Sequence, residues 1–342
     1  MASTGIIPTR SFGKSKEQVG CIGFGAMGLA AFYGEPADQL TVDELLTQCL
    51  SRGVTMIDTA DMYSPWETGK LGYNEEQIGR FLKKYPDQRK KMFLATKFVN
   101  YFTPDGGMKQ RGDREYAFSA CNDSLKRLGV EQIDLYYAHR SVPGTDVTIT
   151  VGAMKELQEQ GKIRYIGVSE YNLDQLERAN KVAHIDAVQI EISPWTPEVL
   201  TNGILDWCEK NGTAVVAYSP LGRGFLTGQY KSPEDFSKDD FRASHPRFTG
   251  ENFAKNLELV RDIEKIAKRK GCQSGEIALA WCLSKSQLII PIPGTKKLKY
   301  LNENINAANI HLKVEDVKEI DSIINSFKVS GERYANPQSL AF

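Results

Sequence analysis

Four ionisable residues stand at or just beyond the ends of short apolar segments: Asp58, Tyr63, Lys97 and His139. A tyrosine hydroxyl is a weak acid with a pKa of about 10, and a neighbouring ammonium lowers that pKa by stabilising the phenolate. A carboxylate can hold the ammonium in place, and an imidazole can orient a substrate oxygen or relay a proton. Each residue alone also fits a structural role, such as a cap or a buried core imidazole. Together, four ionisable residues at the ends of successive segments are unlikely to be a coincidence, and they indicate a functional site.

The elements that must position these residues are strands that alternate with helices. Segments rich in Val, Ile and Leu predict strands buried on both faces, at residues 19–24, 55–60, 92–98, 133–139, 164–169, 187–192, 214–219 and 288–293. Helices are predicted from Thr41 to about Gly53, from Asn74 onward, over 114–128, 147–160 and 173–182, from Pro197 to about 211, and over 274–285. The predicted N-caps include Thr41, Asn74 and Asn172.

Eight strand–helix alternations without a polar linker predict one closed barrel. The expected fold class is therefore α/β, a (β/α)8 TIM barrel formed as a single domain by residues 1–342, with an open doubly wound sheet as the alternative. Catalytic residues of such barrels gather at the C-terminal ends of the strands. Asp58, Lys97 and His139 stand at such ends, and Tyr63 follows in a loop.

Several segments fall outside the eightfold pattern. An N-terminal β-hairpin is expected before the first strand. Residues 221–250 are polar and contain Gly and Pro, which predicts a long loop, functional or disordered, after strand 7. Residues 254–270 predict an additional amphipathic helix, and residues 314–342 predict a C-terminal helix over 314–326 with a tail.

Composition and charge argue against several classes of protein. Forty-three basic residues balance forty-three acidic ones, which gives no reason to expect nucleic acid or an anionic membrane as partner. No apolar run approaches the roughly 20 residues of a membrane span, and the N-terminus lacks the apolar region of a secretory signal. Six scattered cysteines suit free thiols in a reducing compartment, and four dispersed histidines suggest no metal cluster. We therefore expect a cytoplasmic enzyme without a metal.

A glycine-rich segment gives a competing signal. Gly23, Gly25 and Gly28 fit G-x-G-x-x-G directly after a strand, which suggests a dinucleotide-binding Rossmann fold. That motif should open a helix, but Gly34 and Pro36 interrupt any helix before the one expected at residue 41. The favoured interpretation is that small residues let the end of the strand pass closely by a neighbouring group.

The chain resembles the aldo-keto reductase superfamily in motifs that occur in the expected order at the predicted strand ends. The motifs are GVTMIDTADMY (53–63), LATKF (94–98), DLYYAHR (134–140), GKIRYIGVSEYN (161–172), VQIEISPW (188–195), AYSPLGRGFLTG (217–228) and IPIPGTKKLKYLNEN (290–304). The resemblance extends from about Arg10 to Ser326. It is closest to the branch of fungal and plant single-barrel reductases of the YakC or perakine-reductase kind.

This resemblance implies an NADP-dependent oxidoreductase that reduces an aldehyde or ketone to an alcohol. Tyr63 would give the proton, and Lys97 would lower the pKa of Tyr63 and stabilise the growing negative charge. Asp58 would hold Lys97, and His139 would orient the carbonyl oxygen or help relay the proton. The reaction requires no metal and no covalent nucleophile.

The resemblance also implies which residues bind NADPH. Tyr218 would stack on the nicotinamide, and Ser169 and Gln189 would bind its carboxamide. The other expected contacts are Gly25, Ala26, Met27 and Asp58 at strand ends, Ser219, Pro220, Leu221, Gly222 and Arg223 around the pyrophosphate, and Gly294, Thr295, Lys296, Lys297, Glu303 and Asn304 at the adenosine end. A threonine hydroxyl and two lysines at a helix start suit a 2′-phosphate, which favours NADPH over NADH.

Two departures from the superfamily pattern bear on the cofactor. Glu170 stands where many members have Asn beside the carboxamide, although a carboxylate can still accept a hydrogen bond from an amide. Tyr300 stands where many members have Arg, so recognition of a 2′-phosphate would depend on Lys296, Lys297 and Arg223.

The substrate pocket is expected among the loops around the barrel mouth. Phe32, Tyr33, Trp66 and Trp195 can build an apolar wall, or they can pack the barrel rim. Arg140 and the tail near 330–342 are further candidates. The expected substrate is a small-molecule carbonyl compound, and pyridoxal, aryl aldehydes, methylglyoxal and larger ketones all stay open. The sequence indicates no oligomeric state.

Two alternatives use the same residues differently. The potassium-channel β subunits of this superfamily combine the barrel with a regulatory role and can retain the four catalytic residues. Against this role, no long inactivation-type segment precedes the opening hairpin in the sequence. A barrel aldolase would use Lys97 to form a Schiff base, but the residues that match a nicotinamide site argue against it.

Overall fold

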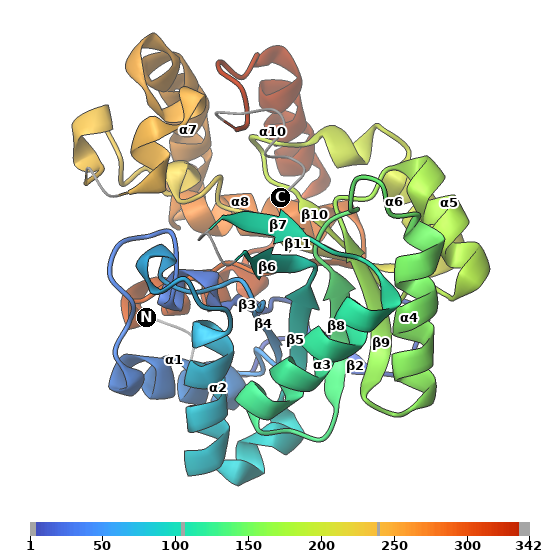
Figure 1. Cartoon of the computed structure of the whole chain (residues 1–342). Coiled ribbons are helices and arrows are strands. Elements are labelled where there is room, and N and C mark those ends of the chain that lie inside the picture. Colours follow the sequence, from blue (N-terminus) through green and yellow to red (C-terminus); the bar gives the residue numbers. More distant parts are fainter. Residues whose placement is uncertain (1–4, 104–106, 238–239, 335–342) are drawn as a thin grey trace.

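The computed structural model describes residues 5–103, 107–237 and 240–334, apart from the side chain of Trp66. Eight parallel strands form one curled sheet in the order β12-β11-β10-β9-β8-β5-β4-β3 (Figure 1). They are β3 (Phe24–Gly25), β4 (Met56–Asp58), β5 (Phe93–Phe98), β8 (Ile133–Ala138), β9 (Ile163–Ser169), β10 (Ala187–Glu191), β11 (Ala214–Tyr218) and β12 (Ile289–Pro291). The predicted α/β class and (β/α)8 arrangement are confirmed.

Every connection between successive barrel strands contains at least one helix, as parallel strands require. The helices are α1 (Gln39–Ser51), α2 (Tyr73–Lys84), α3 (Arg114–Leu128), α4 (Val147–Glu159), α5 (Leu173–Val182), α6 (Ile204–Asn211), α7 (Gly250–Lys270), α8 (Ser274–Lys285), α9 (Leu298–Asn306) and α10 (Val314–Ser326). Helices α3, α5, α8 and α10 have the predicted boundaries. Figure 1 shows the helices on the outside of the sheet.

The first and last strands meet and close the barrel. The N–H of Gly23 donates to the carbonyl oxygen of Pro291 at 2.9 Å, and the N–H of Gly25 donates to that of Pro293 at 3.4 Å. The two strand ends approach so closely that a Cβ on Gly25 would lie 2.7 Å from a carbonyl oxygen of the opposite strand. The glycine-rich segment therefore serves close approach to β12, and the open-sheet alternative does not apply.

Side chains of the strands alternate between two hydrophobic clusters. Along β5, Phe93 and Ala95 belong to the cluster inside the barrel, while Leu94 belongs to the cluster between the barrel and its helices. The predicted hairpin is present as β1 (Thr9–Ser11) and β2 (Gln18–Gly20). Phe12 and Val19 from this hairpin belong to the interior cluster, so the hairpin fills the N-terminal end of the barrel.

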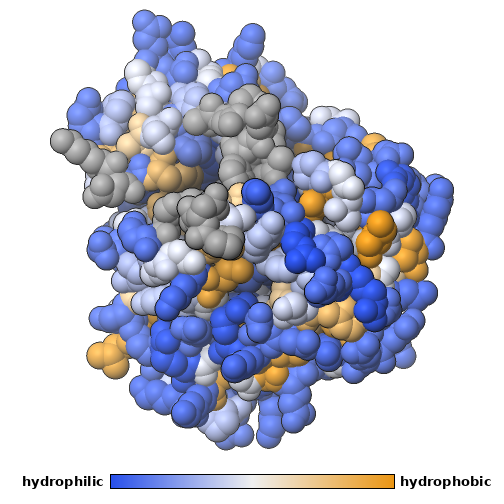
Figure 2. Space-filling view, viewed as in Figure 1, coloured by the Kyte–Doolittle hydropathy of each residue, from blue (hydrophilic) through white to orange (hydrophobic). Residues whose placement is uncertain are grey.

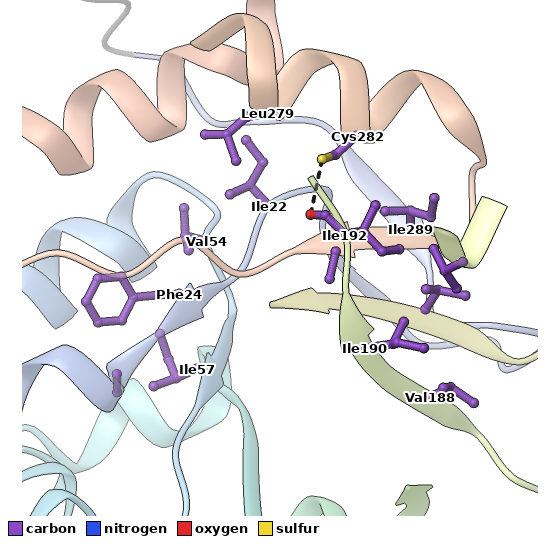
Figure 3. Packing of buried hydrophobic residues seen from close by; sticks show 14 of the residues in the cluster. Ile22, Phe24, Val54, Ile57, Val188, Ile190, Ile192, Leu279, Cys282 and Ile289 are labelled. Atoms are coloured by element: carbon purple, nitrogen blue, oxygen red, sulfur yellow. Dashed lines mark hydrogen bonds between the residues drawn. The ribbon is translucent and has the colours of Figure 1, made fainter. Parts of the chain in front are cut away.

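The outer cluster fixes the helices on the strands. Figure 3 shows Leu279 and Cys282 of α8 beside Ile22 and Ile192. The thiol of Cys282 lies 3.6 Å from the carbonyl oxygen of Ile192. All four side chains are buried, and such packing holds the strand ends in fixed positions relative to one another.

The prediction of one strand over residues 19–24 is wrong. Gln18–Gly20 pairs antiparallel with β1, and only Phe24–Gly25 lies in the barrel sheet. The N–H of Gly20, the last residue of β2, donates to the hydroxyl of Thr55 just before β4 at 3.0 Å, which joins the end of the hairpin to the barrel. One apolar run thus contributes to two sheets, because the chain passes from the hairpin at the N-terminal end of the barrel into the barrel sheet.

Two predicted helix caps are also wrong. Asp38 caps α1, and its carboxylate accepts from the N–H of Thr41 at 2.7 Å. Asn74 lies within the first turn of α2, with its side chain directed inward. The third prediction is confirmed, because Asn172 caps α5 by accepting from the N–H of Gln175 at 3.0 Å. Aspartate and asparagine are favoured caps, and tertiary contacts decide which candidate serves.

Additional segments lie near the C-terminal end of the barrel (Figure 1). An antiparallel hairpin of β6 (Asn100–Phe102) and β7 (Met108–Gln110) follows β5 and was not predicted. The expected long loop at 221–250 consists, in its described part, of short 3-10 turns with irregular segments between them: η5 (Phe225–Thr227), η6 (Pro233–Asp235), η7 (Phe241–Ser244) and η8 (Pro246–Phe248). Helix α7 begins at the end of this loop, and α10 packs against α7.

The face shown in Figure 2 is mainly hydrophilic, with hydrophobic residues in small groups. The large hydrophobic side chains that are exposed come from separate elements: Ile6, Phe32, Leu40, Ile149, Leu173 and Val314. Among the residues that the structure describes, no helix combines the length and the apolar character needed to cross a membrane.

A methyl group has no room at Gly294 in the seam between the first and last strands. An alanine Cβ there would lie 2.3 Å from the carbonyl oxygen of Gly25, so we expect Gly294→Ala to lower the free energy of unfolding by about 1–3 kcal/mol. Urea unfolding measures this change. Gly152 in α4 offers a matched control, because its added Cβ would meet nothing closer than 3.9 Å. Equal stability of Gly294→Ala and the unchanged chain would contradict a tight seam.

Candidate active site

The alternation of strand side chains brings predicted site residues into one layer. Asp58, Lys97, His139, Gln189 and Tyr218 each lie two residues beyond a member of the interior cluster. Successive side chains of a strand point to opposite faces, so these five point the same way as the interior cluster. They form a polar layer at the C-terminal end of the barrel, where catalytic groups of this fold gather.

Lys97 is the centre of this layer, and its side chain is 0% exposed. Its Nζ donates to Asp58 Oδ1 at 2.5 Å, to the carbonyl oxygen of Thr59 at 2.8 Å and to the hydroxyl of Tyr63 at 3.1 Å. The ammonium thus has an acceptor for each of its three protons. The second oxygen of Asp58 accepts from Gln189 Nε2 at 2.7 Å. Three of the four predicted catalytic residues are therefore in hydrogen-bond contact.

The loop after β4 places Tyr63 against Lys97. The N–H of Asn74 donates to the carbonyl oxygen of Tyr63 at 3.0 Å, and Asn74 Oδ1 accepts from the hydroxyl of Thr59 at 2.6 Å. Burial raises the pKa of Tyr63, and the nearby Lys97 only partly opposes this effect. Lys97 thus acts in the predicted direction, but burial has the larger effect, so the pKa of Tyr63 lies above its ordinary value in the described structure and Tyr63 keeps its proton at neutral pH.

His139 lies beside Tyr63, with ring centroids 5.9 Å apart and ring planes at 81°. Burial lowers the pKa of His139 well below its ordinary value, and Lys97 and Arg140 lower it further. The imidazole is therefore neutral at physiological pH. Asn100 Nδ2 lies 3.5 Å from His139 Nδ1. Sequence reasoning missed Asn100, because it lies in the hairpin that was not predicted.

The residues predicted for the nicotinamide lie at the ends of β9, β10 and β11. Ser169 Oγ accepts from Arg140 Nη1 at 3.1 Å, and Gln189 binds Asp58 as described above. The hydroxyl of Tyr218 donates to Glu170 Oε1 at 2.8 Å. Glu170 has a φ of 57°, in the left-handed region that residues other than glycine seldom adopt. Such strained residues are often found at functional sites.

Arg333 also lies in this region, although no motif in the sequence indicates it. Its Nη2 donates to Glu170 Oε1 at 2.9 Å, and its Nε donates to Glu191 Oε2 at 2.5 Å. The only signal was the general expectation that the tail near 330–342 contributes to the substrate pocket. Residues 335–342 of that tail lie outside the described residues.

The loop predicted for the pyrophosphate follows β11. Ser219 and Arg223 have left-handed backbone conformations, with φ of 48° and 57°. The N–H of Gly222 donates to the carbonyl oxygen of Ser219 at 2.8 Å, which folds Pro220 and Leu221 into a tight turn. Turns that combine left- and right-handed residues can direct several N–H groups at an anion.

The predicted pocket residues Phe32 and Tyr33 contact the loop at 221–250. Their ring centroids lie 5.9 Å and 5.1 Å from that of Phe241. Lys296, predicted for the adenosine end, donates to the carbonyl oxygens of Tyr33 at 2.9 Å and Glu35 at 2.5 Å. The β3–α1 connection thus lies between the long loop and the segment after β12.

The remaining residues predicted for the adenosine end surround the start of α9. Gly294, Thr295 and Lys297 precede this helix, and Glu303 and Asn304 lie within it. The residues predicted at the first strand end, Gly25, Ala26 and Met27, lie nearby at the end of β3, where Gly25 packs against Gly294. The N–H of Lys297 donates to the hydroxyl of Thr295 at 3.0 Å. Two lysines therefore stand at a helix N-terminus, as the sequence predicts.

Trp195 packs the rim of the barrel. It is 2% exposed and stacks on Phe225 with centroids 4.6 Å apart, and Phe248 meets it edge-on at 5.3 Å. Rim packing is one of the two roles considered for it above. The side chain of Trp66, another predicted pocket residue, lies outside the described parts of the structure.

A cavity of about 180 Å³ lies beside the polar layer. Glu170, Glu191 and Arg333 line it together with residues between β10 and α6, whereas Asp58, Tyr63, Lys97 and His139 do not. Within the described ranges, no three His, Cys, Asp or Glu side chains come together as a metal site would require.

Comparison with known proteins gives consistent matches over nearly the whole chain. The model of the family described as "Aldo/keto reductase family" matches residues 21–325. The aldo-keto reductase yakc [NADP(+)] of Schizosaccharomyces pombe is 45% identical over 331 residues, which are 96% of this chain and 94% of that protein. The aldo-keto reductase str7 of Strobilurus tenacellus is 42% identical over 336 residues, which are 96% of this chain and 95% of that protein.

Solved structures agree with this match. A thermostable aldo-keto reductase, Tm1743, in complex with the inhibitor epalrestat has a TM-score of 0.73 at 29% identity and covers 93% of this chain and 100% of its own. The glycerol dehydrogenase AKR11B4 from Gluconobacter oxydans has a TM-score of 0.82 at 26% identity and covers 96% of this chain and 98% of its own.

The pair of Lys97 and Asp58 leads to a prediction about stability. Burial raises the pKa of Asp58, and Lys97 supplies the main opposing attraction. Lys97→Met therefore leaves a buried carboxylate without its cation, and we expect it to lower the free energy of unfolding by about 3–5 kcal/mol at neutral pH. Denaturant unfolding measures the loss. The double variant Asp58→Asn, Lys97→Met is the control and should lose clearly less, since no charge stays unpaired; equal losses would refute this account.

Proposed function

This chain belongs to the aldo/keto reductase family, and we propose that it uses NADPH to reduce a small aldehyde or ketone to an alcohol. The observation that carries the proposal is the buried ammonium of Lys97, which binds Asp58 and lies 3.1 Å from the Tyr63 hydroxyl. Such a group suits a reaction in which one substrate oxygen gains negative charge and then a proton. NADPH, when bound, supplies the hydride.

The choice of NADPH has support from the relatives and from the chain. The relative from Schizosaccharomyces pombe carries NADP(+) in its name. Arg140 donates to Ser169, a proposed carboxamide residue. Its Nε is buried and has no hydrogen-bond partner among the described residues, so a donor beside the proposed nicotinamide site is available to a ligand. The turn after β11 suits the pyrophosphate, and Lys296 and Lys297 before α9 suit a 2′-phosphate.

In the proposed mechanism, Tyr63 gives its proton to the carbonyl oxygen. The positive charge of Lys97 stabilises the phenolate that this transfer leaves behind. Asp58 keeps the ammonium in position, and Gln189 holds the second oxygen of Asp58. The neutral imidazole of His139 can donate a hydrogen bond to the same carbonyl oxygen and so orient it.

The geometry favours this role over the aldolase alternative. A Schiff base needs a neutral, accessible amine, whereas Lys97 is buried and donates to three acceptors. Its pKa is raised, since the attraction of Asp58 and Tyr63 outweighs the opposing effect of burial. A regulatory role of the channel-β-subunit kind would use the same barrel, and a turnover assay separates the two functions.

Loss of the Tyr63 hydroxyl tests the proton donor. With NADPH and a panel of aldehydes and ketones, we expect Tyr63→Phe to lower kcat by about 10²–10⁴-fold while NADPH binding persists. Absorbance of NADPH follows turnover, and NADH serves as the comparison cofactor. Tyr85→Phe, at the end of α2, is a matched control that should retain full activity. If the unchanged protein binds NADPH but reduces no carbonyl compound, the regulatory role is favoured instead.

The pH dependence of reduction should be flat through the neutral range. Because the pKa of Tyr63 is raised, the donor stays protonated even above the pH at which a free tyrosine ionises. Because the pKa of His139 is lowered, its imidazole stays neutral even below the pH at which a free histidine gains a proton. We therefore expect kcat at saturating NADPH to show no inflection between about pH 6 and pH 9. An inflection near pH 6.5 that disappears in His139→Asn would show that this histidine titrates during turnover.

A further inference from the structure

The segment after α10 returns to the C-terminal end of the barrel. Ser330 anchors it on α7: its N–H donates to Asn256 Oδ1 at 2.8 Å, and its hydroxyl donates to Asn252 Oδ1 at 2.7 Å. Gly331 follows with a φ of 87°, and a Cβ on it would lie 2.8 Å from a neighbouring carbonyl oxygen. These contacts fix the path by which the chain reaches Arg333.

Arg333 joins the ends of three barrel strands. Its Nε donates to Glu191 Oε2 at 2.5 Å, at the end of β10, and its Nη2 donates to Glu170 Oε1 at 2.9 Å, just beyond β9. The same Nη2 donates to the hydroxyl of Tyr218, the last residue of β11. One planar guanidinium can make these contacts together because its donors form a rigid fork.

The two carboxylates need this cation. The side chains of Glu191 and Glu170 are only 3% and 12% exposed, and burial of a charge without a partner is costly. Arg223 lies 3.7 Å from Glu191, and Arg140 attracts Glu170. Burial by itself would raise the pKa of Glu170, but Arg333 and then Arg140 hold it below its ordinary value.

The contacts of Glu170 leave one oxygen available. Oε1 accepts from Arg333, from the Tyr218 hydroxyl at 2.8 Å and from the N–H of Glu191 at 3.2 Å. Oε2 receives no hydrogen bond from any residue in the described ranges. An amide N–H of a ligand could therefore bind Oε2 while Arg333 keeps the rest of the carboxylate fixed.

We propose that Arg333 is a positioning residue for the nicotinamide end of the cofactor. It neutralises Glu170 and Glu191, and it holds the Glu170 carboxylate and the Tyr218 ring where the carboxamide and the nicotinamide ring are received. The inference depends on the proposed NADPH binding. It also explains how a carboxylate can occupy position 170, since the tail brings the countercharge that an amide at this position would not need.

Removal of the charge on Arg333 tests the proposal. NADPH binding, followed by quenching of protein fluorescence, should weaken about ten- to hundredfold in Arg333→Met, because a charged hydrogen-bond partner of a buried group is lost. Lys328→Met is the matched control, since it removes an exposed cation from the same segment, and its Kd should equal that of the unchanged protein.

A second substitution distinguishes charge neutralisation from mere anchoring of the tail. In the double variant Arg333→Met, Glu170→Gln, most of the lost affinity should return, because a neutral amide at position 170 needs no cation and Glu191 keeps Arg223 at 3.7 Å. Failure of this rescue would overturn the proposal, as would an unaltered Kd in Arg333→Met.

Two further results complete the test. If Arg333→Met does not fold, as judged by circular dichroism, the double variant is compared with Glu170→Gln alone. Similar Kd values would support the proposal, and a tenfold difference would refute it. If the unchanged protein itself fails to bind NADPH, the proposed function fails, which is a separate result from any difference among the variants.

Discussion

A charged ammonium that is shut off from water constrains much of this molecule. Lys97 must find an acceptor for each of its three protons, and the chain supplies a carboxylate, a backbone carbonyl and a phenol from β4 and its following loop. Parallel pairing of β4 with β5 places Asp58 opposite Ala95, two residues before Lys97. The loop that carries Tyr63 is held in turn by Asn74 at the start of α2. The contacts proposed for catalysis are therefore also the contacts that offset the cost of burying the Lys97 ammonium.

Much of the fold could be predicted from the sequence because both faces of each barrel strand are buried. Apolar runs then mark the strands, and the residue that ends such a run marks the site, as Asp58, Lys97 and His139 illustrate. The same signal failed at residues 19–24, where one apolar run crosses from the hairpin into the barrel wall. Residue type, which predicted the helix caps, failed at α1, since Asp38 and Thr41 are both good candidates by type and only the observed hydrogen bond distinguishes them.

The contacts that sequence reasoning missed are those made between distant segments. Arg333 meets Glu170 across 163 positions of the chain, and no spacing rule connects a residue in the C-terminal tail to a strand end in the middle. Asn100 was missed for a different reason, because the three-residue strands β6 and β7 are too short to give a recognisable periodic pattern. The effect of Lys97 on the pKa of Tyr63 could be predicted because it depends on one neighbour, whereas the larger, opposite effect of burial depends on the whole barrel and could not.

The seam between Gly25 and Gly294 has a consequence for how the chain acquires its shape. The contact joins the start of the barrel to its last strand, so the sheet can close only after most of the chain has been synthesised and brought together. Closing so long a loop is slow relative to local helix formation, and until then the edges of β3 and β12 expose unpaired N–H and C=O groups. Such edges can pair with other chains. We therefore expect the period before closure to be the time at which this protein is most prone to aggregate.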